Sequence, residues 1–314
     1  MRRKPKVSLY IPCYNVEKYI GRCLASILKQ TYPIEEILII DDGSTDNTIK
    51  IASKYPVRIV RHSENRGLAA ARNTAIANAK NEFIASLDAD CVASPTWLEK
   101  LMDNFVEENV AGVGGRLIEK YTSSLGDKWR SVHLRQDQGE IRKSVDALPG
   151  CNCVYRKSVL KKVGGYNERY KTNFEDIDLS YRVRAKNYKL IYTPDAIVFH
   201  MCRDSVSSAV RRAWRFGFAD RLTIRSPAEF LSRYLFDIGC SLCYCIKDLH
   251  QGNYDLLLVD IIVFTHWLRC DWENFRSRKK WSVTKGTIVP PKIPEAIFVY
   301  MKKFFRHAER GFRL

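Results

Sequence analysis

Residues 7–200 repeat one pattern, in which a short Val- and Ile-rich run alternates with a segment whose apolar residues have helical spacing. Four such runs are expected to form strands, at residues 7–12, 37–41, 57–61 and 82–88. Helices are expected between them, at Glu17 to Lys29, after Ser44, and at residues 68–80. Strands joined through helices by short links predict an α/β domain whose mostly parallel sheet is covered on both faces.

Polar residues follow three of these runs, at the points where the strands should end. They are Pro12-Cys13-Tyr14-Asn15, Asp41-Asp42-Gly43-Ser44 and Asp88-Ala89-Asp90. Ligands of open α/β sheets bind outside the carboxyl ends of the strands. The pattern therefore predicts a binding site at this edge, although Ser44 is also a good N-cap for the next helix. Asp88 and Asp90 repel each other unless water solvates both or a cation lies between them.

The pattern continues beyond the fourth run with less regular spacing. A helix is expected from Ser94, followed by a Gly-rich strand (110–117) and an irregular polar stretch (119–146). A helix from Glu175 and a strand that ends at His200 complete the series.

Residues 204–314 are basic and mostly helical in pattern, and no uncharged apolar stretch is long enough to cross a bilayer. The final segment, 294–314, is amphipathic, with an apolar face flanked by lysines and arginines. Two interpretations remain open for it. It is either a helix docked on the protein core or a helix that lies on an anionic membrane.

The chain is strongly basic, since 52 Lys and Arg against 35 Asp and Glu give a net charge of +17. Such a charge attracts nucleic acid, an acidic membrane surface or phosphorylated substrates, or it simply keeps the protein soluble. Charge alone does not choose among these.

The sequence contains ten cysteines, and its basic N-terminus lacks the apolar core of a signal peptide. We therefore expect reduced thiols rather than disulfides. The densest group, Cys240, Cys243 and Cys245, stands in an apolar segment, which favours packing over a metal cluster.

Several motifs in fixed order carry a family resemblance. They are VSLYIPCYN, ILIIDDGSTDNT, NRGLAAARN, SLDADC, GGYNE, EDIDLSYR and the strand-terminal His200. From about Lys6 to His200 the chain resembles the inverting nucleotide-sugar glycosyltransferases of family 2. The resemblance implies a GT-A fold over residues 1–203, with a nucleotide-sugar half to about 118 and an acceptor half from 119. Residues 204–314 would form a helical extension.

The resemblance implies a divalent metal, Mn²⁺ or Mg²⁺, at the Asp-x-Asp turn. A sugar nucleotide leaves as a charged diphosphate, and a hard cation bound by carboxylates neutralises that charge. Asp90 would be the direct ligand, and Asp88 would lie near the ribose and the metal's waters. His200 either joins the metal shell, which would suit Mn²⁺ better than Mg²⁺, or is structural.

The resemblance also implies residues that bind the donor nucleotide. Asp42 would accept a hydrogen bond from the base, which favours a UDP-sugar, although thymidine would serve equally. Tyr14 would stack on the base, and the backbone near Pro12 would contact it. Arg72 would lie beside the base and Asp42, unless it is an ordinary charge on a helix surface.

Asp176 matches the family's general base, which takes the acceptor hydroxyl's proton during inverting transfer. Acidic residues are also common at helix starts because of the helix dipole. Glu175 would bind the acceptor or orient the loop.

Processive members of the family carry Gln-x-x-Arg-Trp, whereas this chain has Arg211-Arg212-Ala213-Trp214. We therefore expect a single transfer per encounter, with Trp214 holding the acceptor or closing over the diphosphate. The acceptor would be a glycan or a lipid-linked sugar in surface polysaccharide or glycolipid synthesis. Charge and the final segment suggest a cytoplasmic protein at the inner face of the plasma membrane.

Three other classes of protein fit the sequence less well. A nucleotide-sugar binding protein without catalysis would require Asp176 or the aspartate pair to be misplaced. A nucleic-acid binder is suggested only by charge, and the chain has no recognisable nucleic-acid module. A dinucleotide oxidoreductase is excluded because no Gly-x-Gly-x-x-Gly follows the first strand.

Overall fold

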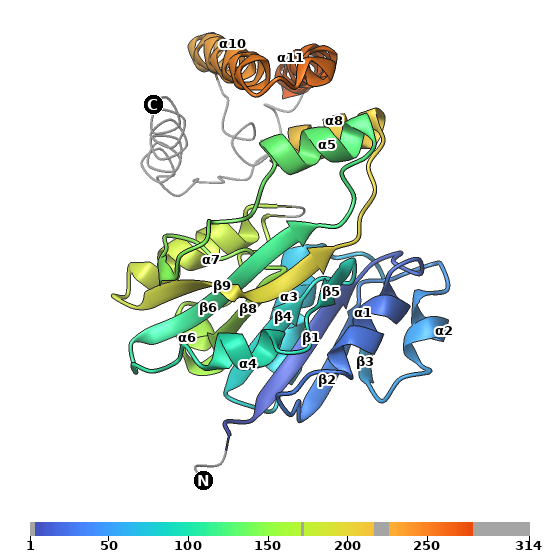
Figure 1. The fold of residues 1–314 in the computed structure, drawn as a ribbon, viewed down its shortest axis with the longest axis vertical. Helices are drawn as coiled ribbons and strands as arrows, with labels where there is room; N and C mark the ends of the chain where they lie inside the picture. The colour runs from blue at the N-terminus through green and yellow to red at the C-terminus, as the bar shows by residue number, and fades with distance from the viewer. Residues whose placement is uncertain (1–3, 171–172, 217–225, 279–314) are drawn as a thin grey trace.

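The computed structural model describes residues 4–170, 173–216 and 226–278, which form a sheet with helices on both faces and a group of helices at one end (Figure 1). The strands are β1 (Val7–Cys13), β2 (Glu36–Asp41), β3 (Arg58–Arg61), β4 (Phe83–Leu87), β5 (Cys91–Ala93), β6 (Val110–Glu119), β7 (Lys143–Ser144), β8 (Asn152–Arg156) and β9 (Lys189–His200). The helices are α1 (Ile20–Ile27), α2 (Thr48–Ala52), α3 (Leu68–Asn78), α4 (Trp97–Met102), α5 (Leu125–His133), α6 (Lys157–Lys162), α7 (Glu175–Arg184), α8 (Val206–Phe216), α10 (Pro227–His250) and α11 (Leu257–Arg278), with a 3₁₀ turn at Tyr254–Leu256.

The sheet has the strand order β3-β2-β1-β4-β8-β6-β9-β5, and β7 pairs with β9. Strands β3, β2, β1 and β4 are parallel, and so are β6 and β9. Strand β8 lies antiparallel between β4 and β6 and joins the two parallel parts. The expected mixed, mostly parallel α/β sheet with C-terminal helices is confirmed.

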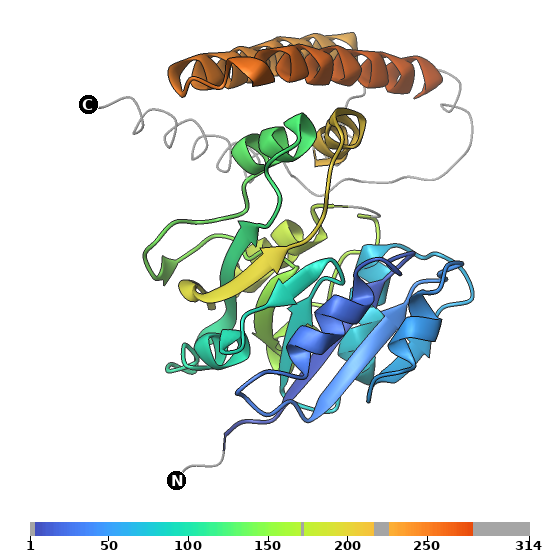
Figure 2. The same cartoon turned by 45° about the vertical axis from the view of Figure 1, so that its right-hand side comes forward.

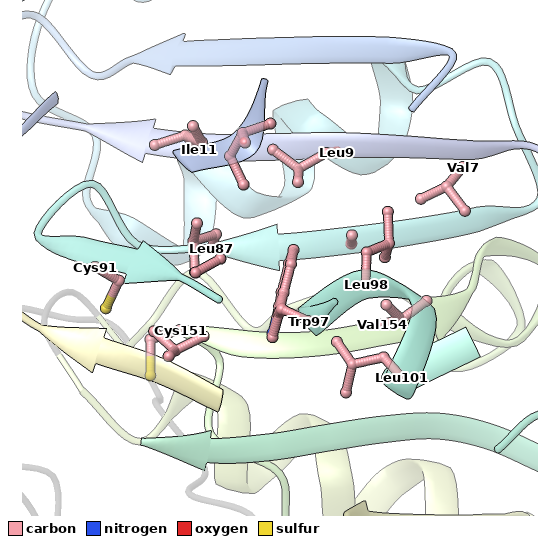
Figure 3. Close-up of a cluster of buried hydrophobic side chains, with 14 of the residues drawn as sticks. Val7, Leu9, Ile11, Leu87, Cys91, Trp97, Leu98, Leu101, Cys151 and Val154 are labelled. Atoms are coloured by element: carbon pink, nitrogen blue, oxygen red, sulfur yellow. The ribbon is translucent and has the colours of Figure 1, made fainter. Parts of the chain in front are cut away.

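Alternating side chains of the strands build a core on each face of the sheet, as the pleat requires. Leu9 and Ile11 of β1 pack with α1 and α4 on one face, where Trp97 lies fully buried (Figure 3). Tyr10, from the same strand, packs with α3, α6 and α7 on the other. Trp97 also donates its indole N–H to Asn152 Oδ1 at 2.6 Å, which ties α4 to β8.

Every strand and helix expected before residue 118 is present, but two helix starts differ. Helix α2 begins at Thr48, and Ser44 instead accepts a hydrogen bond from the Asn15 N–H at 3.0 Å, so the N-cap expected at Ser44 is wrong. Helix α4 begins at Trp97, because Ser94 makes a turn through its carbonyl to the Trp97 N–H.

The stretch 119–146, expected to be irregular, contains α5 and β7. Helix α5 is short and has few apolar residues, Leu125, Trp129 and Val132, in a stretch that is otherwise polar. Its polar side chains are buried nevertheless, since Asp127 and Arg130 are 3% and 2% exposed and pair with each other. Hydrophobic periodicity does not predict a helix that is buried largely through ion pairs.

Helices α5, α8, α10 and α11 form a helical module at the end of the sheet where β6 and β9 terminate (Figures 1 and 2). Its core contains Trp129, Ala209, Leu256, Val263 and Trp267. None of the helices within the described ranges has the length and apolar character needed to cross a membrane. The amphipathic segment 294–314 lies outside the described residues.

The nine cysteines whose side chains the structure describes are free thiols. Cys240 packs against the core of the helical module, and Cys243 and Cys245 are partly exposed.

Gly115 in β6 provides a direct test of the register between β6 and β9. The register of β6 and β9 shifts after it, and a Cβ there would lie 2.2 Å from the Ala196 carbonyl oxygen. We expect Gly115→Ala to cost about 1–3 kcal/mol, seen as a lower Tm in calorimetry. Gly239→Ala is the matched control, because Gly239 lies in α10 with nothing near its Cβ position, and it should be neutral or stabilising. Equal stability of the Gly115 variant and wild type would contradict the described register.

Candidate active site

Arg72 lies at the centre of a cluster of polar side chains at the carboxyl ends of the strands. Helix α3 carries it inward, and its side chain is only 1% exposed. Its Nη1 donates to the Ser86 hydroxyl at 2.8 Å and to the Gly150 carbonyl at 2.6 Å. Its Nη2 lies 3.2 Å from Asp88 Oδ1, and its Nε lies 3.5 Å from Glu175 Oε1. The alternative of an ordinary helix-surface charge is therefore wrong.

The backbone of Gly150 connects Arg72 with Asp176, because it forms hydrogen bonds with both side chains. Its carbonyl accepts from Arg72, and its N–H donates to Asp176 Oδ2 at 2.9 Å. A Cβ at residue 150 would lie 2.8 Å from the guanidinium, so only glycine allows this approach.

Asp176 begins α7 together with Glu175, and the two side chains differ in environment. Asp176 is half-buried, and its Oδ1 accepts from the Ile177 N–H at 2.8 Å. Glu175 is 3% exposed, and its Oε2 lacks a hydrogen-bond partner among the described residues. Burial and the neighbouring Asp176 raise the pKa of Glu175 to about 8, although Arg72 opposes the shift.

Asp88 and Asp90 point to different partners. Burial raises the pKa of Asp88, which pairs with Arg72. Asp90 Oδ2 lies 3.2 Å from His200 Nε2. Burial acts to raise the pKa of Asp90, but the hydrogen bond and charge of His200 outweigh it and lower the pKa.

His200 is held from its other side by a residue that the sequence did not single out. Its Nδ1 lies 2.9 Å from Glu119 Oε2, and Glu119 receives a hydrogen bond from Arg130 at 2.8 Å. Burial acts to lower the pKa of His200, but the two carboxylates raise it well above its usual range. Glu119 ends β6 and lies opposite His200 in the register of β6 and β9, a contact between distant segments that the sequence pattern does not reveal.

One donor atom each from Asp90, His200 and Cys202 lie within 4.8 Å of one another. An imidazole and a carboxylate at this spacing fit a divalent cation, and Glu119 can orient the imidazole from the second nitrogen. Cys202 was also missed from the sequence. Its thiol lies 3.0 Å from Arg212 Nη2, and Arg212 in turn binds Asp204 at 3.0 Å.

The residues expected to bind the base lie at the ends of β1 and β2. Asp42 is buried, and its oxygens accept from the Arg66 and Gly67 N–H groups, both at 2.8 Å. His62 Nδ1 lies 2.6 Å from Asp42 Oδ1. Asp42 therefore anchors the turn that begins α3.

Pro12 is buried in β1, where it pairs with Ile40, and Tyr14 is 49% exposed. Arg72 was expected beside Asp42, but its guanidinium contacts Asp88 and Glu175 instead. Trp214 belongs to α8, and its side chain lies outside the described residues.

The sheet order and the cluster at its edge define a GT-A fold, which solved structures share. A mannosyltransferase from Pyrobaculum calidifontis, in complex with GDP-Man and Mn²⁺, superposes with a TM-score of 0.54 at 19% identity, over 98% of this chain and 87% of that one. Residues 8–164, half of the chain, match the model of Glycosyl transferase family 2. The chain belongs to this family.

Two curated glycosyltransferases are also similar to this chain in sequence. A pre-mycofactocin glycosyltransferase of Mycobacterium tuberculosis is 28% identical over 270 residues, which cover 82% of this chain and 56% of the relative. A poly-β-1,6-N-acetyl-D-glucosamine synthase of Staphylococcus epidermidis is 28% identical over 280 residues, which cover 83% of this chain and 67% of the relative. The chain thus spans between about half and two thirds of these relatives.

The environment of Glu175 leads to a pH-dependent prediction. Its folded pKa of about 8 lies above the ordinary value of 4.5, so folding takes up a proton between these two values. This contribution to stability is fully present below pH 4.5 and is lost as the pH rises through about 8. Glu175→Gln stays neutral, so its Tm relative to wild type should increase from about pH 5.5 to about pH 8.5.

Differential scanning fluorimetry at the two pH values measures this difference. Glu108→Gln, which changes an exposed carboxylate, is the matched control. A constant Tm difference between Glu175→Gln and wild type would show that Glu175 is ionised in the folded protein throughout this range.

Proposed function

We propose that the protein is an inverting glycosyltransferase that moves a sugar from a nucleoside-diphosphate donor to an acceptor hydroxyl. The observation that carries this proposal is the shared Gly150 contact. It sets the carboxylate of Asp176 beside the Arg72 and Asp88 pair, within the same cluster as Asp90 and His200. Family membership supports the class of reaction, and the arrangement supplies the separate groups that the reaction needs.

Asp90 and His200 would hold the divalent cation, and Asp88 would lie beside the donor. When bound, the cation supplies positive charge that stabilises the departing diphosphate. Arg72 holds Asp88 in place through the ion pair, and Glu119 orients the His200 ring through Nδ1. The imidazole in this set favours Mn²⁺ over Mg²⁺.

Asp176 would accept the proton of the acceptor hydroxyl as its oxygen attacks the anomeric carbon. A carboxylate serves because the hydroxyl proton becomes acidic only as the new bond forms. The N–H groups of Gly150 and Ile177 fix the orientation of the Asp176 carboxylate before the acceptor arrives. Glu175, buried behind it, would position this end of α7 rather than contact the acceptor.

For the donor base we propose uridine. Exposed Tyr14 offers a face on which a base can stack, and Asp42 lies at the neighbouring strand end. The mannosyltransferase neighbour was solved with GDP-Man, so a donor panel has to include guanosine as well as uridine and thymidine sugars. The transfer is proposed to be single, to a glycan or lipid-linked acceptor.

We also propose that the protein binds the inner membrane face through the helical module. Helices α10 and α11 bury polar residues, Asp237, Asp248 and Asp260, which are each at most 1% exposed. Their apolar residues are exposed instead, each by 49% or more, namely Leu231, Leu235, Leu242, Ile246, Leu249, Leu258 and Ile261. Such a surface on a chain of charge +17 suits an anionic lipid bilayer.

The Asp176→Asn variant tests the proposed base. The assay measures metal-dependent release of the nucleoside diphosphate from a panel of donors in the presence of acceptor extract. We expect the release from the donor that the wild type uses to fall by about 10²–10⁴-fold in this variant. Donor binding, followed by thermal shift with Mn²⁺, should be retained. Asp178→Asn is the matched control, because Asp178 lies two residues on in α7 and pairs with Arg182.

The outcomes of this assay separate the alternatives. Binding of a donor without turnover by the wild type would favour a nucleotide-sugar binding protein without catalysis. Full activity of Asp176→Asn would exclude this residue as the base.

Vesicle co-sedimentation tests the membrane surface. We expect the double variant Leu235→Ser and Leu242→Ser to bind vesicles with anionic lipid at least about tenfold more weakly than wild type, because two exposed leucines would no longer enter the lipid. Val106→Ser, which removes an exposed apolar side chain far from this surface, should bind normally. Unchanged vesicle binding, or concentration-dependent dimerisation through these leucines, would contradict the proposal.

A further inference from the structure

A second group of metal-ligand side chains lies inside the helical module. His133 comes from α5, Asp248 from α10 and Asp260 from α11, and their side chains have no exposed surface. His133 Nε2 lies 2.9 Å from Asp248 Oδ2 and 3.7 Å from Asp260 Oδ1. One donor atom from each residue lies within 4.8 Å of the others. The proposed catalytic reaction uses none of the three.

Two buried carboxylates in this place are costly unless a cation neutralises them or one of them takes up a proton. The neighbouring Lys247 directs its Nζ to the Val132 carbonyl at 2.9 Å. Arg233 pairs with Asp237 on its own helix. A divalent cation bound by the group would balance the charge of both carboxylates.

Hydrogen bonding in the group is also incomplete. Asp260 Oδ1 accepts from the Trp129 indole N–H at 2.7 Å, but Asp260 Oδ2 is buried and lacks a hydrogen-bond partner among the described residues. Buried carboxylate oxygens are almost always satisfied in folded proteins. An oxygen left without a donor, next to an imidazole and a second carboxylate, is the environment of a metal ligand.

We propose that His133, Asp248 and Asp260 bind a divalent transition-metal ion, and their imidazole and carboxylate donors suit Zn²⁺. Zinc accepts imidazole nitrogen and carboxylate oxygen in a compact shell of three or four protein ligands. The site is structural, because it lies closed within the helices.

The ion would join α5 to α10 and α11, which lie far from α5 in the sequence. Helix α5 carries His133 and, one turn earlier, Arg130, which donates to Glu119 and to Asp204 Oδ2 at 2.6 Å. Glu119 in turn holds His200. By fixing α5 against α10 and α11, the zinc ion would also stabilise the helix that supports the active-site histidine.

The experiment uses a full-length chain in which the active-site ligands are removed, Asp90→Asn with His200→Ala. This protein is stripped with chelator and titrated with Zn²⁺, and its zinc content is measured by mass spectrometry after gel filtration. We expect one Zn²⁺ per chain and a Tm that rises by several degrees at saturating zinc, since a ligand that binds only the folded state stabilises it.

Adding Asp260→Asn to this background should abolish both the bound zinc and the Tm rise. Adding Asp237→Asn, which changes another buried carboxylate of α10, should leave both intact. If the Asp90→Asn, His200→Ala chain binds no zinc and shows no Tm shift, the proposal is wrong. This conclusion does not depend on whether the Asp260→Asn and Asp237→Asn variants fold. Retention of stoichiometric zinc by a folded Asp260→Asn variant would equally overturn the proposal. Neither outcome depends on glycosyl transfer.

Discussion

The contacts of the buried Arg72 guanidinium are the interactions on which the arrangement of the candidate active site depends. The guanidinium lies between Asp88 and Glu175 and donates to the carbonyl of Gly150, whose N–H holds Asp176. A buried charge without partners is strongly unfavourable, and loss of one partner of such a pair typically costs about 3–5 kcal/mol. Helices α3 and α7, strand β4 and the segment before β8 are therefore held in one relative position.

A second chain of ion pairs extends from this cluster to the helical module. His200 contacts Asp90 on one side and Glu119 on the other, and Arg130 of α5 joins Glu119 to Asp204. The module thus supports the edge of the site where β9 ends. Its exposed apolar helices lie at the opposite end from the N-terminal strand (Figure 2), so attachment to a membrane would leave the sheet projecting away from the lipid.

Much of the fold was predictable because parallel strands bring their carboxyl ends to one edge, so polar residues that follow separate runs must meet in space. Contacts between distant segments were not. Arg72 stands in an Ala-rich helix and resembles a surface charge in sequence, but it is buried because Asp88 and Glu175 neutralise it. Helix α5 was missed for the same reason, since ion pairs rather than apolar packing bury Arg130.

We propose that Asp90 and His200 hold the donor's cation in the same site as Asp176. Anomalous diffraction from crystals grown with Mn²⁺ and UDP tests it most directly. We expect one strong manganese peak in contact with Asp90 Oδ2 and His200 Nε2, and the UDP diphosphate next to it. A UDP molecule bound at the strand ends with no manganese at these two side chains would contradict it.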